Sequence, residues 1–431
     1  MIKIIEGLTC PIDEIMGRYE TATEDAVCDA VGEIIKNVRK YGDKAVLDYT
    51  EKFDGARPDT LEVSKEEMDA AFVRTDDEMI SILTEAAKNI SAFHQKQVRQ
   101  NFVINENEGI VLGQKITPIE KVGIYVPGGT ARYPSSVLMN AIPAQIAGVK
   151  EIIMVTPPDK DGTIPDTLLA AAKIAGVTRV FKIGGAQAIA ALAYGTETTP
   201  KVYKIVGPGN VFVAEAKRQV FGKVSIDMIA GPSEILVIAD GTCQAKNVAA
   251  DLLSQAEHDK MASAVLVTDS KELALGVQAE IEKQIPMLER SEIARVSIDN
   301  NGKIFVTDSL EASIEIANEI APEHLELCVE DPFAYISKIK NAGSIFLGKY
   351  CPESLGDYFA GPNHTLPTSG TAKFSSPLSV DDFIKKSSFM YYTEDALKDC
   401  YTKVSKFAKA EGLTAHAKAA EIRFERTNNN E

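Results

Sequence analysis

A glutamine and a histidine in the middle of the chain have side chains suited to metal binding. Gln255 and His258 stand near the end of a pattern in which Val248, Leu252 and Leu253 recur at helical spacing. Residues three apart share a helix face, so an amide oxygen and an imidazole nitrogen can converge on one point. Such a pair would supply half of a coordination shell. A capped surface helix with one hydrogen-bonded histidine explains the same residues, and the pair alone does not decide between these interpretations.

A carboxylate and an imidazole are direct neighbours at Glu323 and His324, between Pro322 and the apolar run 325–329. Both side chains can act as bases near neutral pH. A polar cap between a helix and a strand is the alternative. A helix-to-strand loop lies at the end of a parallel sheet opposite the usual ligand site. A catalytic role therefore predicts either that the following strand runs antiparallel or that the loop reaches across.

Two segments nearer the C-terminus combine polar groups with glycine. Residues 356–358 (Gly-Asp-Tyr) and 363–364 (Asn-His) lie in a Gly/Pro-rich stretch with no helical or strand period, which predicts a functional irregular loop. Glu411 and His416 flank a glycine, in a pattern that predicts a helix end, a break and a new turn.

Three predicted strand-to-helix junctions are rich in glycine: Pro127-Gly128-Gly129, Gly184-Gly185-Ala186-Gln187 and Gly207-Pro208-Gly209-Asn210. Loops of this kind let backbone N–H groups approach a phosphate beside the positive end of a helix. None of them is a GxGxxG, so the usual dinucleotide fingerprint is absent. A tight turn is the alternative explanation for each loop.

The elements that would position these residues alternate between strand and helix. Strands are predicted at 122–126, 151–156, 179–183 and 202–206, and again near 235–239, 264–268, 296–298 and 344–347. Strands alternating with helices favour parallel sheets covered on both faces. We therefore predict two similar α/β units. Helical segments are expected before them, from about Thr21 to Phe102, and after them, from Ser379 to Ala420, and the polar tail beyond Arg423 is expected to be disordered.

Composition limits the class of protein. The net charge of −16 disfavours nucleic acid and anionic membranes as partners. No run approaches the roughly 20 apolar residues of a membrane span, and no secretory signal is visible in MIKIIEGLTC. The six cysteines form no CxxC pair, which favours reduced thiols in the cytoplasm over disulfides or a zinc–thiolate site. None lies in a motif typical of an activated nucleophile.

Motifs along the whole chain carry a family resemblance. They are AGPSEILVIAD and DLLSQAEHD around Gln255, with VGIYVPGG (122–129), GGAQAIAALAYGTE (184–197), KIVGPGN (204–210), APEHLEL (321–327), ESLGDYFAGPNHTLPT (353–368) and EGLTAHAKA (411–419). In this order the sequence resembles the histidinol dehydrogenases. Each motif alone is weakly specific, but the set is highly specific.

The resemblance implies a role for each of these positions. It implies a zinc ion held by Gln255, His258, Asp357 and His416. It implies Glu323 and His324 as catalytic bases, and NAD contacts at Tyr125, Gln187 and Asn210. Substrate contacts are implied at Ser233, Gln255, His258, His324, Asp357, Glu411 and His416. In the family the positions of Glu411 and His416 reach into the neighbouring subunit's site, which implies a homodimer. His364 is interpreted as a structural or supporting residue.

The resemblance also implies an architecture and a reaction. Two incomplete Rossmann-like doubly wound units are expected, one at 123–230 binding NAD and one assembled from 1–20, 105–122 and 231–378 carrying the metal. A helical subdomain (21–104) and a helical C-terminal tail (379–431) that reaches the partner complete it. The implied reaction is the zinc-dependent, NAD-linked, four-electron oxidation of L-histidinol to L-histidine through a bound aldehyde.

Three alternatives remain at this point. A family relative could oxidise another small amino or hydroxy alcohol. A metal-binding regulatory protein without turnover is the second alternative. A zinc hydrolase is the third, and the absence of an HExxH helix weakens it.

Overall fold

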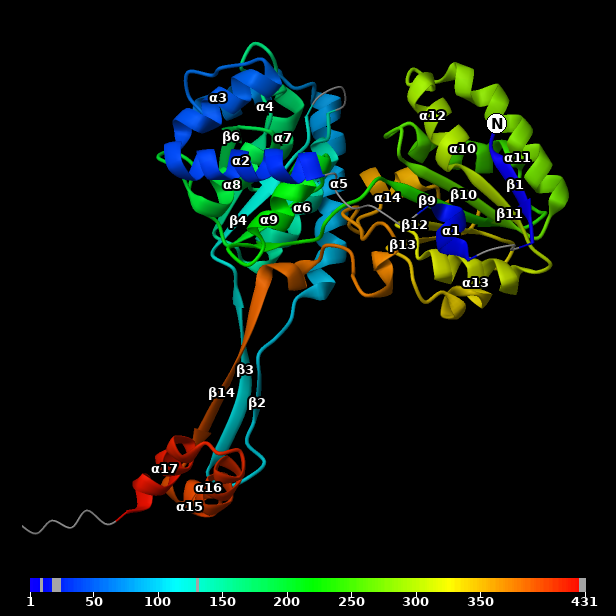
Figure 1. Cartoon of the computed structure of the whole chain (residues 1–431). Coiled ribbons are helices and arrows are strands. Elements are labelled where there is room, and N and C mark those ends of the chain that lie inside the picture. Colours follow the sequence, from blue (N-terminus) through cyan, green and yellow to red (C-terminus); the bar gives the residue numbers. More distant parts are fainter. Residues whose placement is uncertain (8–10, 18–24, 129–131, 426–431) are drawn as a thin grey trace, which may run out of the picture. The chain divides into compact units, whose positions relative to one another are not determined.

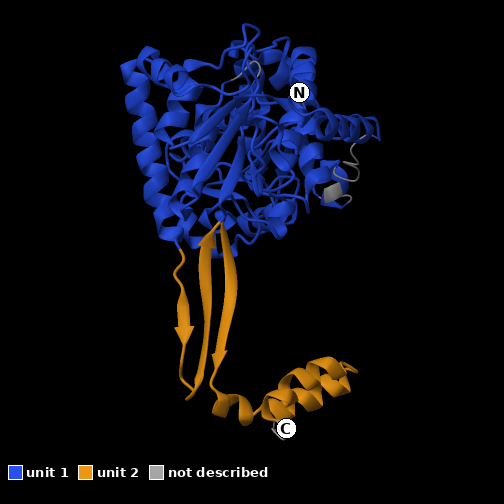
Figure 2. Cartoon of the chain, turned by 90° about the vertical axis from the view of Figure 1, so that its left-hand side faces the viewer, with its two compact units in different colours: residues 1–98, 119–383 blue, residues 99–118, 384–431 orange. Residues whose placement is uncertain are grey.

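The computed structural model describes residues 1–7, 11–17, 25–128 and 132–425. The chain divides into two compact units, coloured separately in Figure 2. Unit 1 comprises residues 1–98 and 119–383, and unit 2 comprises residues 99–118 and 384–431. The expectations for Cys10, for Gly129, for the helix start near Thr21 and for the last residues of the polar tail lie outside the described residues.

The first sheet of unit 1 has five parallel strands in the order β6–β5–β4–β7–β8. They are β4 (Lys121–Tyr125), β5 (Glu151–Thr156), β6 (Arg179–Lys182), β7 (Lys204–Val206) and β8 (Ser225–Ile226). Helices α6 (Pro134–Ala147) and α7 (Asp166–Ile174) cover one face. Helices α8 (Gly185–Tyr194) and α9 (Val211–Val220) cover the other (Figure 1). The first of these strands along the chain, β4, is therefore the central one, and the later strands are added on both sides of it.

The N-terminal helices join the same two layers. Helices α2 (Asp25–Tyr41) and α3 (Asp43–Asp54) bury their apolar residues in the core of α8 and α9. Helices α4 (Lys65–Arg74) and α5 (Asp77–His94) do so in the core of α6 and α7. The expected helices are present, and they extend the covering of the first sheet.

The second sheet of unit 1 has six parallel strands in the order β1–β11–β10–β9–β12–β13. They are β1 (Lys3–Glu6), β9 (Glu234–Ala239), β10 (Ser263–Thr268), β11 (Lys303–Val306), β12 (His324–Cys328) and β13 (Ser344–Leu347). Helices α10 (Ala245–Ala256), α11 (Lys271–Gln284) and α12 (Ser291–Asn301) pack on one face. Helices α13 (Leu310–Ile320) and α1 (Ile12–Met16) pack on the other.

The strand predicted at 296–298 is wrong, because these residues belong to α12. Ala294 and Ile298, four residues apart, are both fully buried on the side of α12 that faces the core. The run 296–298 is therefore part of an amphipathic helix whose buried side includes Ala294 and Ile298, and the strand is β11, which follows it.

Unit 2 contains a three-stranded antiparallel sheet and three helices. Strand β3 (Ile110–Pro118) lies between β2 (Phe102–Ile104) and β14 (Ile384–Tyr392). Helices α15 (Glu394–Lys398), α16 (Tyr401–Ala410) and α17 (Thr414–Glu421) follow. Two expectations are thereby corrected. Residues 384–392 form a strand and not a helix, and 110–118 pair with that strand and not with the second parallel sheet.

Among the described residues, every helix is too short or too polar to cross a lipid bilayer.

Candidate metal and active site

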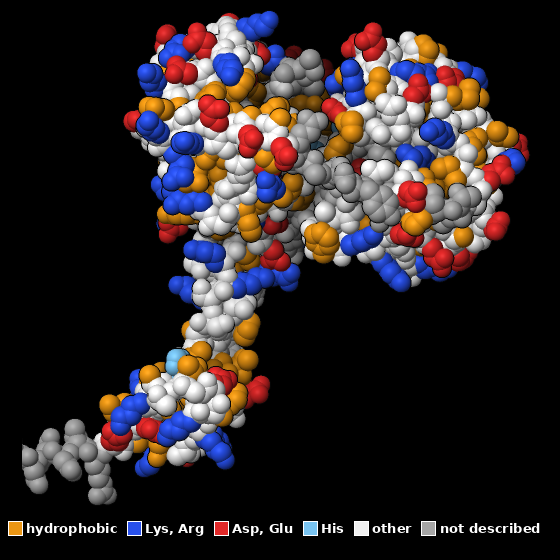
Figure 3. Space-filling model, in the orientation of Figure 1, with side chains coloured by type: hydrophobic (Ala, Val, Ile, Leu, Met, Phe, Trp, Pro, Cys, Tyr) orange, Lys and Arg blue, Asp and Glu red, His pale blue; other side chains and the backbone are white. Residues whose placement is uncertain are grey.

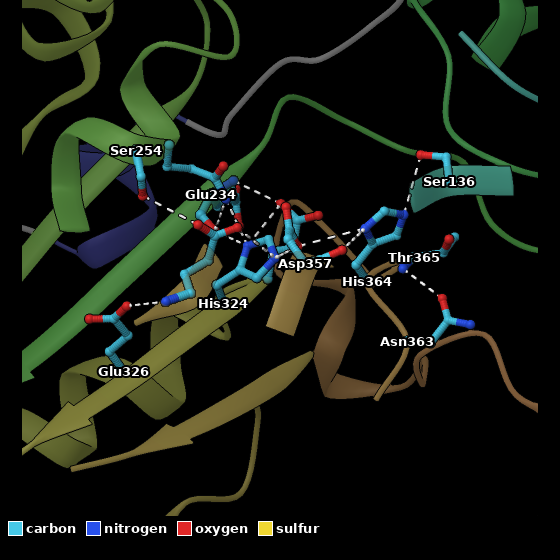
Figure 4. A network of polar contacts seen from close by, with 12 residues as sticks. Ser136, Glu234, Ser254, His324, Glu326, Asp357, Asn363, His364 and Thr365 are labelled. Atoms are coloured by element: carbon cyan, nitrogen blue, oxygen red, sulfur yellow. Dashed lines mark hydrogen bonds and ion pairs between the residues drawn. The ribbon is translucent and has the colours of Figure 1, made fainter. Parts of the chain in front are cut away.

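A buried polar cluster lies at the amino-terminal ends of two neighbouring strands, β9 and β12 (Figure 4). Glu234 and His324 are the first residues of these strands. The last turn of α10 contributes Gln255, and a short helix, α14 (Glu353–Tyr358), contributes Asp357. Because β12 is parallel to both its neighbours, the expected antiparallel strand does not occur. The cluster forms instead at the edge of the sheet opposite the usual ligand site.

The loop before β12 makes a sharp turn. Helix α13 ends at Ala321, which adopts a left-handed conformation with φ of 50° and is followed by Pro322. This turn places Glu323 and His324 at the start of the strand, where both side chains are buried.

The imidazole of His324 is oriented by contacts to Nδ1. The carbonyl oxygen of Glu234 lies 2.9 Å from Nδ1, and Nε2 of Gln255 lies 2.8 Å from it. In the neutral ring the carbonyl oxygen, which can only accept, favours the tautomer with its proton on Nδ1 and so leaves Nε2 as the basic atom, whereas the amide N–H of Gln255 favours the opposite tautomer. That Nε2 lies 3.7 Å from Oδ1 of Asp357 and 3.8 Å from Oε1 of Glu353.

Glu323 has the environment of a base that works near neutral pH. Its Oε2 accepts a hydrogen bond of 2.8 Å from the backbone N–H of Glu234. Burial raises the pKa of Glu323 to about 7. A carboxyl group with this pKa exchanges protons readily with water at neutral pH.

The surrounding carboxylates control the charge on His324. Burial alone would lower its pKa, but the charges of Glu323, Asp357 and Glu353 outweigh burial and raise the pKa to about 10. Burial likewise opposes ionisation of Asp357, yet its interactions with His324 and His364 hold the pKa of Asp357 well below its usual range. The cluster therefore pairs the ionised carboxylate of Asp357 with the cationic ring of His324. A bound metal ion could supply the positive charge in place of that ring.

Three of the four expected metal ligands belong to this cluster. Gln255 and Asp357 lie in the cluster, and His258, in the turn just after α10, lies near enough for the charge of Asp357 to act on it. Burial lowers the pKa of His258 below its usual value, although the nearby charge of Asp357 opposes this shift. Within the described part of the chain, Oε1 of Gln255, Nε2 of His324 and Oε1 of Glu353 are buried without hydrogen-bond partners.

Buried polar atoms without partners are rare in folded proteins, and a bound ion or ligand is a common explanation. His324, Glu353 and Asp357 also offer ligand atoms that all lie within 4.8 Å of one another. Nitrogen and oxygen donors without a thiolate suit zinc and tolerate manganese or cobalt. The residues present therefore fit a divalent cation.

Glu353 was missed in the sequence because its segment was expected to be an irregular loop. Residues 353–358 form α14, so Glu353 and Asp357, four apart, share one face. That spacing was visible in the sequence. Gly356 allows the helix to approach β13, since a Cβ there would lie 2.5 Å from a ring carbon of Phe346.

His364 supports Asp357. Its Nδ1 lies 3.1 Å from the carbonyl oxygen of Asp357, and its Nε2 lies 3.3 Å from Oγ of Ser136 on α6. Figure 4 shows these side chains one after another across the cluster, in the spatial order His324, Asp357, His364 and Ser136.

The remaining predicted substrate and metal residues lie around or outside this cluster. Ser233 is half-buried and immediately precedes Glu234. Glu411 and His416 are exposed side chains of unit 2. The cluster described above is built from residues of unit 1.

The three predicted NAD contacts follow strands of the first sheet. Tyr125 ends β4, and its hydroxyl oxygen accepts a 3.1 Å hydrogen bond from the backbone N–H of Gly185. Gln187 lies fully buried in the first turn of α8, and neither of its amide atoms has a partner among the residues described. Asn210 caps α9 by accepting hydrogen bonds from the N–H groups of Phe212 and Val213.

These positions lie at the carboxyl edge of the first sheet, where the strand order reverses between β4 and β7. Parallel α/β sheets bind nucleotides at such a reversal. The unpartnered amide of Gln187 is consistent with a ligand there.

Gly207, at the start of the third glycine-rich loop, is held by a buried ion pair that we call the Gly207 clamp. Asp227 accepts a 2.7 Å hydrogen bond from the N–H of Gly207, and Lys217 donates a 3.0 Å hydrogen bond to its carbonyl oxygen. The two side chains also pair with each other and are only 2% and 1% exposed. Gly207 has φ of 112°, and a Cβ would lie 2.2 Å from the carbonyl oxygen of Tyr125. These contacts therefore hold the backbone of the loop at Gly207 in one conformation.

The described cysteines give no sign of an activated thiol. Cys28, Cys243, Cys328, Cys351 and Cys400 are free. Burial raises the pKa of Cys243 to about 11 and raises that of Cys328 further. These shifts disfavour Cys243 and Cys328 as nucleophiles.

Together these features define an α/β protein with two parallel sheets, a buried histidine–carboxylate cluster on one and nucleotide-type loops on the other. The histidinol dehydrogenase family model matches residues 18–424. The chain belongs to the histidinol dehydrogenase family.

Individual relatives agree. The chain is 56% identical over 397 residues to histidinol dehydrogenase of Geobacillus kaustophilus, covering 92% of this chain and 94% of the relative. It is 58% identical over 391 residues to histidinol dehydrogenase of Clostridium acetobutylicum, covering 91% of each. The crystal structure of histidinol dehydrogenase from Elizabethkingia anophelis is 40% identical and superimposes with a TM-score of 0.92 over 98% of both chains.

Proposed function

We propose that this protein is a zinc-dependent, NAD-linked dehydrogenase that oxidises L-histidinol to L-histidine through a bound aldehyde, in the last steps of histidine biosynthesis. The single observation that carries the proposal is the cluster of buried, unpartnered donor atoms beside Asp357, with two bases next to it. Family membership supports the choice of substrate.

The proposed metal ligands are Gln255, His258, Asp357 and the partner's His416. Bound zinc supplies a positive charge that orients the substrate's imidazole and amine as a template. Ser233 and the partner's Glu411 complete the substrate pocket in this proposal.

The two bases act in turn. In its neutral form, which a bound cation nearby would favour over the imidazolium, His324 takes the proton of the alcohol at Nε2 while a hydride leaves the carbon for NAD, which gives the aldehyde. Glu323 then takes a proton from a water molecule as that water attacks the aldehyde carbon. The resulting monoanion of the hydrate loses a second hydride to a second NAD, which gives the carboxylic acid, and the acid then releases its proton to water. Two hydrides carry four electrons, and the carboxylate of histidine is the product.

The NAD proposal rests on the reversal point of the first sheet. Tyr125, Gln187 and Asn210 would contact the dinucleotide there. The strand orders of both sheets support the interpretation of two incomplete Rossmann-like units.

The homodimer proposal is supported by the surface of unit 2. Its sheet exposes Phe102, Val103, Met390 and Tyr391 at 50%, 59%, 73% and 60%. Figure 3 shows further hydrophobic side chains on the surface of its helical part. Because successive strand residues point to opposite faces, apolar side chains are exposed on both faces of this sheet, as is typical of an element that a partner covers. A cytoplasmic location, with no nucleic acid or membrane partner, fits the free thiols and the negative charge.

The first experiment measures NADH formed from L-histidinol at alkaline pH, before and after chelation and after zinc return. We expect two NADH per histidinol, lost with the chelator and restored by zinc. If the protein oxidises another amino alcohol but not histidinol, the proposed substrate is wrong and that amino alcohol takes its place. Tight zinc binding without turnover of any alcohol would favour a metal-binding regulatory protein.

A further inference from the structure

A second group of carboxylates lies behind the cluster and has no role in the steps above. Glu326 is fully buried in the middle of β12, two residues after His324 and on the same face of the strand. Asp251, on α10 one turn before Gln255, shares a side-chain hydrogen bond with it. The other inward positions of this sheet face are apolar, and Cys328 packs with them. A buried carboxyl pair in such a place costs stability unless its contacts compensate.

The contacts of Glu326 lead directly to α14. Its Oε1 accepts a 2.7 Å hydrogen bond from the backbone N–H of Glu353, the first residue of that helix. From α10, Oγ of Ser254 lies 3.2 Å from Oε2 of Glu353 and donates a 2.8 Å hydrogen bond to the carbonyl oxygen of Asp251. One network therefore joins the three elements that carry Gln255, His324 and Asp357.

Helix α14 needs such an attachment. It has six residues, which is too short to be stable alone, and its N-cap residue, Pro352, makes no side-chain cap. Asp357 is one turn along from the bond to Glu326, so a displaced first turn would displace Asp357 as well.

We propose that Glu326, together with Asp251, is a positioning pair that fixes α14 and so holds Asp357 and Glu353 against His324. The pair touches neither substrate nor metal. Asp251, Glu326 and Cys328 have ligand atoms within 4.8 Å of one another. We assign them a positioning role and not a second metal site, because Oε1 of Glu326 is already used by Glu353 and the Cys328 thiol lies 3.7 Å from the Glu326 carboxylate.

The test compares Glu326→Leu with Glu326→Gln in the full-length protein. Leucine removes the acceptor for Glu353, whereas glutamine keeps one. Leucine leaves one backbone N–H without its acceptor, a loss smaller than the total stability of a typical folded domain, so Glu326→Leu should fold. Asp251→Asn/Glu326→Leu serves as a second variant in case the unpaired Asp251 prevents folding. Ser297→Ala is the matched control, since Ser297 on α12 is also fully buried and donates one hydrogen bond, to Ala262.

Two readouts are needed. Hydrogen exchange of the peptide containing residues 353–358, in metal-free protein, should be at least about tenfold faster in Glu326→Leu and near wild type in Glu326→Gln. Zinc affinity, from competition with a chelator, should fall about 10–100-fold in Glu326→Leu, as for other residues that orient metal ligands. Glu326→Gln should lose less than about tenfold, and Ser297→Ala should lose none.

Unchanged exchange of 353–358 in folded Glu326→Leu would overturn the proposal. A second zinc ion per subunit that disappears in Glu326→Leu would overturn it too, in favour of a metal site. The zinc arm rests on the proposed function, but the exchange arm does not. If wild-type protein binds no zinc, the exchange result still decides whether Glu326 fixes α14.

Discussion

The Gly207 clamp gives a prediction whose size follows from burial. Lys217→Met leaves the carboxylate of Asp227 buried without its cation, and breaking a buried ion pair costs about 3–5 kcal/mol. Asp227 keeps hydrogen bonds of 2.7 Å from the N–H groups of Gly207 and Met228, so we expect a loss near the lower end, about 3 kcal/mol. That loss is roughly a hundredfold in the unfolding equilibrium.

The double variant separates stability from function. Lys217→Met/Asp227→Leu replaces both charges by apolar groups and should recover most of the loss, to within about 2 kcal/mol of wild type. Gly207 has then lost both of its contacts. We therefore expect the KM for NAD to stay raised in the double variant although its stability returns.

Two assays are needed. Urea unfolding, monitored by hydrogen exchange of peptides from the first sheet, measures stability, and steady-state kinetics with varied NAD measures the KM for NAD. Lys283→Met is the control, because its pair with Glu280 lies at the surface and should leave the free energy of unfolding unchanged. A single-variant loss below about 1 kcal/mol, or an unchanged KM for NAD in the double variant, would refute the reasoning.

Three further predictions concern single residues and subunits. Glu323→Gln should slow oxidation of separately supplied aldehyde by about 10²–10⁴-fold and spare alcohol oxidation more, and equal losses would remove its assigned role. Burial raises the pKa of Asp54 to about 6, so the stability it contributes falls as pH rises from about 4 to about 6 and stays lower above that. Asp54→Asn should stabilise the protein by about 1–2 kcal/mol at pH 7.5, a value reduced because solvent screens this partly buried group, and by little at pH 4. Thermal melts at the two pH values measure this, and equal effects at both would contradict the prediction. If active sites are shared, co-expressed His416→Ala and Asp357→Asn subunits should recover roughly a quarter of wild-type activity from mixed dimers, while each variant alone stays inactive; no recovery would place both residues in one subunit's site.

Local periodicity was enough to predict most strands of both parallel sheets, although the strand expected at 296–298 is β11 at 303–306. Strands and helices of an α/β unit pack against sequence neighbours, so the alternation of short β-branched runs and small-residue helices is visible in one stretch of chain. The strand β14 was not predictable in this way. Its strand partner is β3, and residues 119–383 of unit 1 lie between the two strands in the sequence.

The candidate site was partly predictable for a similar reason. Gln255 and His258 could be grouped from their spacing, and Glu323 and His324 are adjacent. Their place in helix-to-strand loops indicated the edge of the sheet opposite the usual ligand site, but a site built at that edge could not be derived, because it depends on the turn at Ala321 and on the parallel direction of β12. Glu326 was read only as part of an apolar run, and its role depends on a backbone N–H donated by α14.

The pairing of β3 with β14 sets an order of assembly. Pro118 pairs with Ile384, and all of residues 119–383 must be synthesised between them. At about 5–20 residues per second, β3 waits roughly 15–50 s for its partner to leave the ribosome. Both parallel sheets are complete in sequence by then and can fold first. Unit 2, which carries Glu411 and His416, is the last part of the chain to form, so in the proposed dimer each subunit closes its neighbour's active site only after its own sheets are in place.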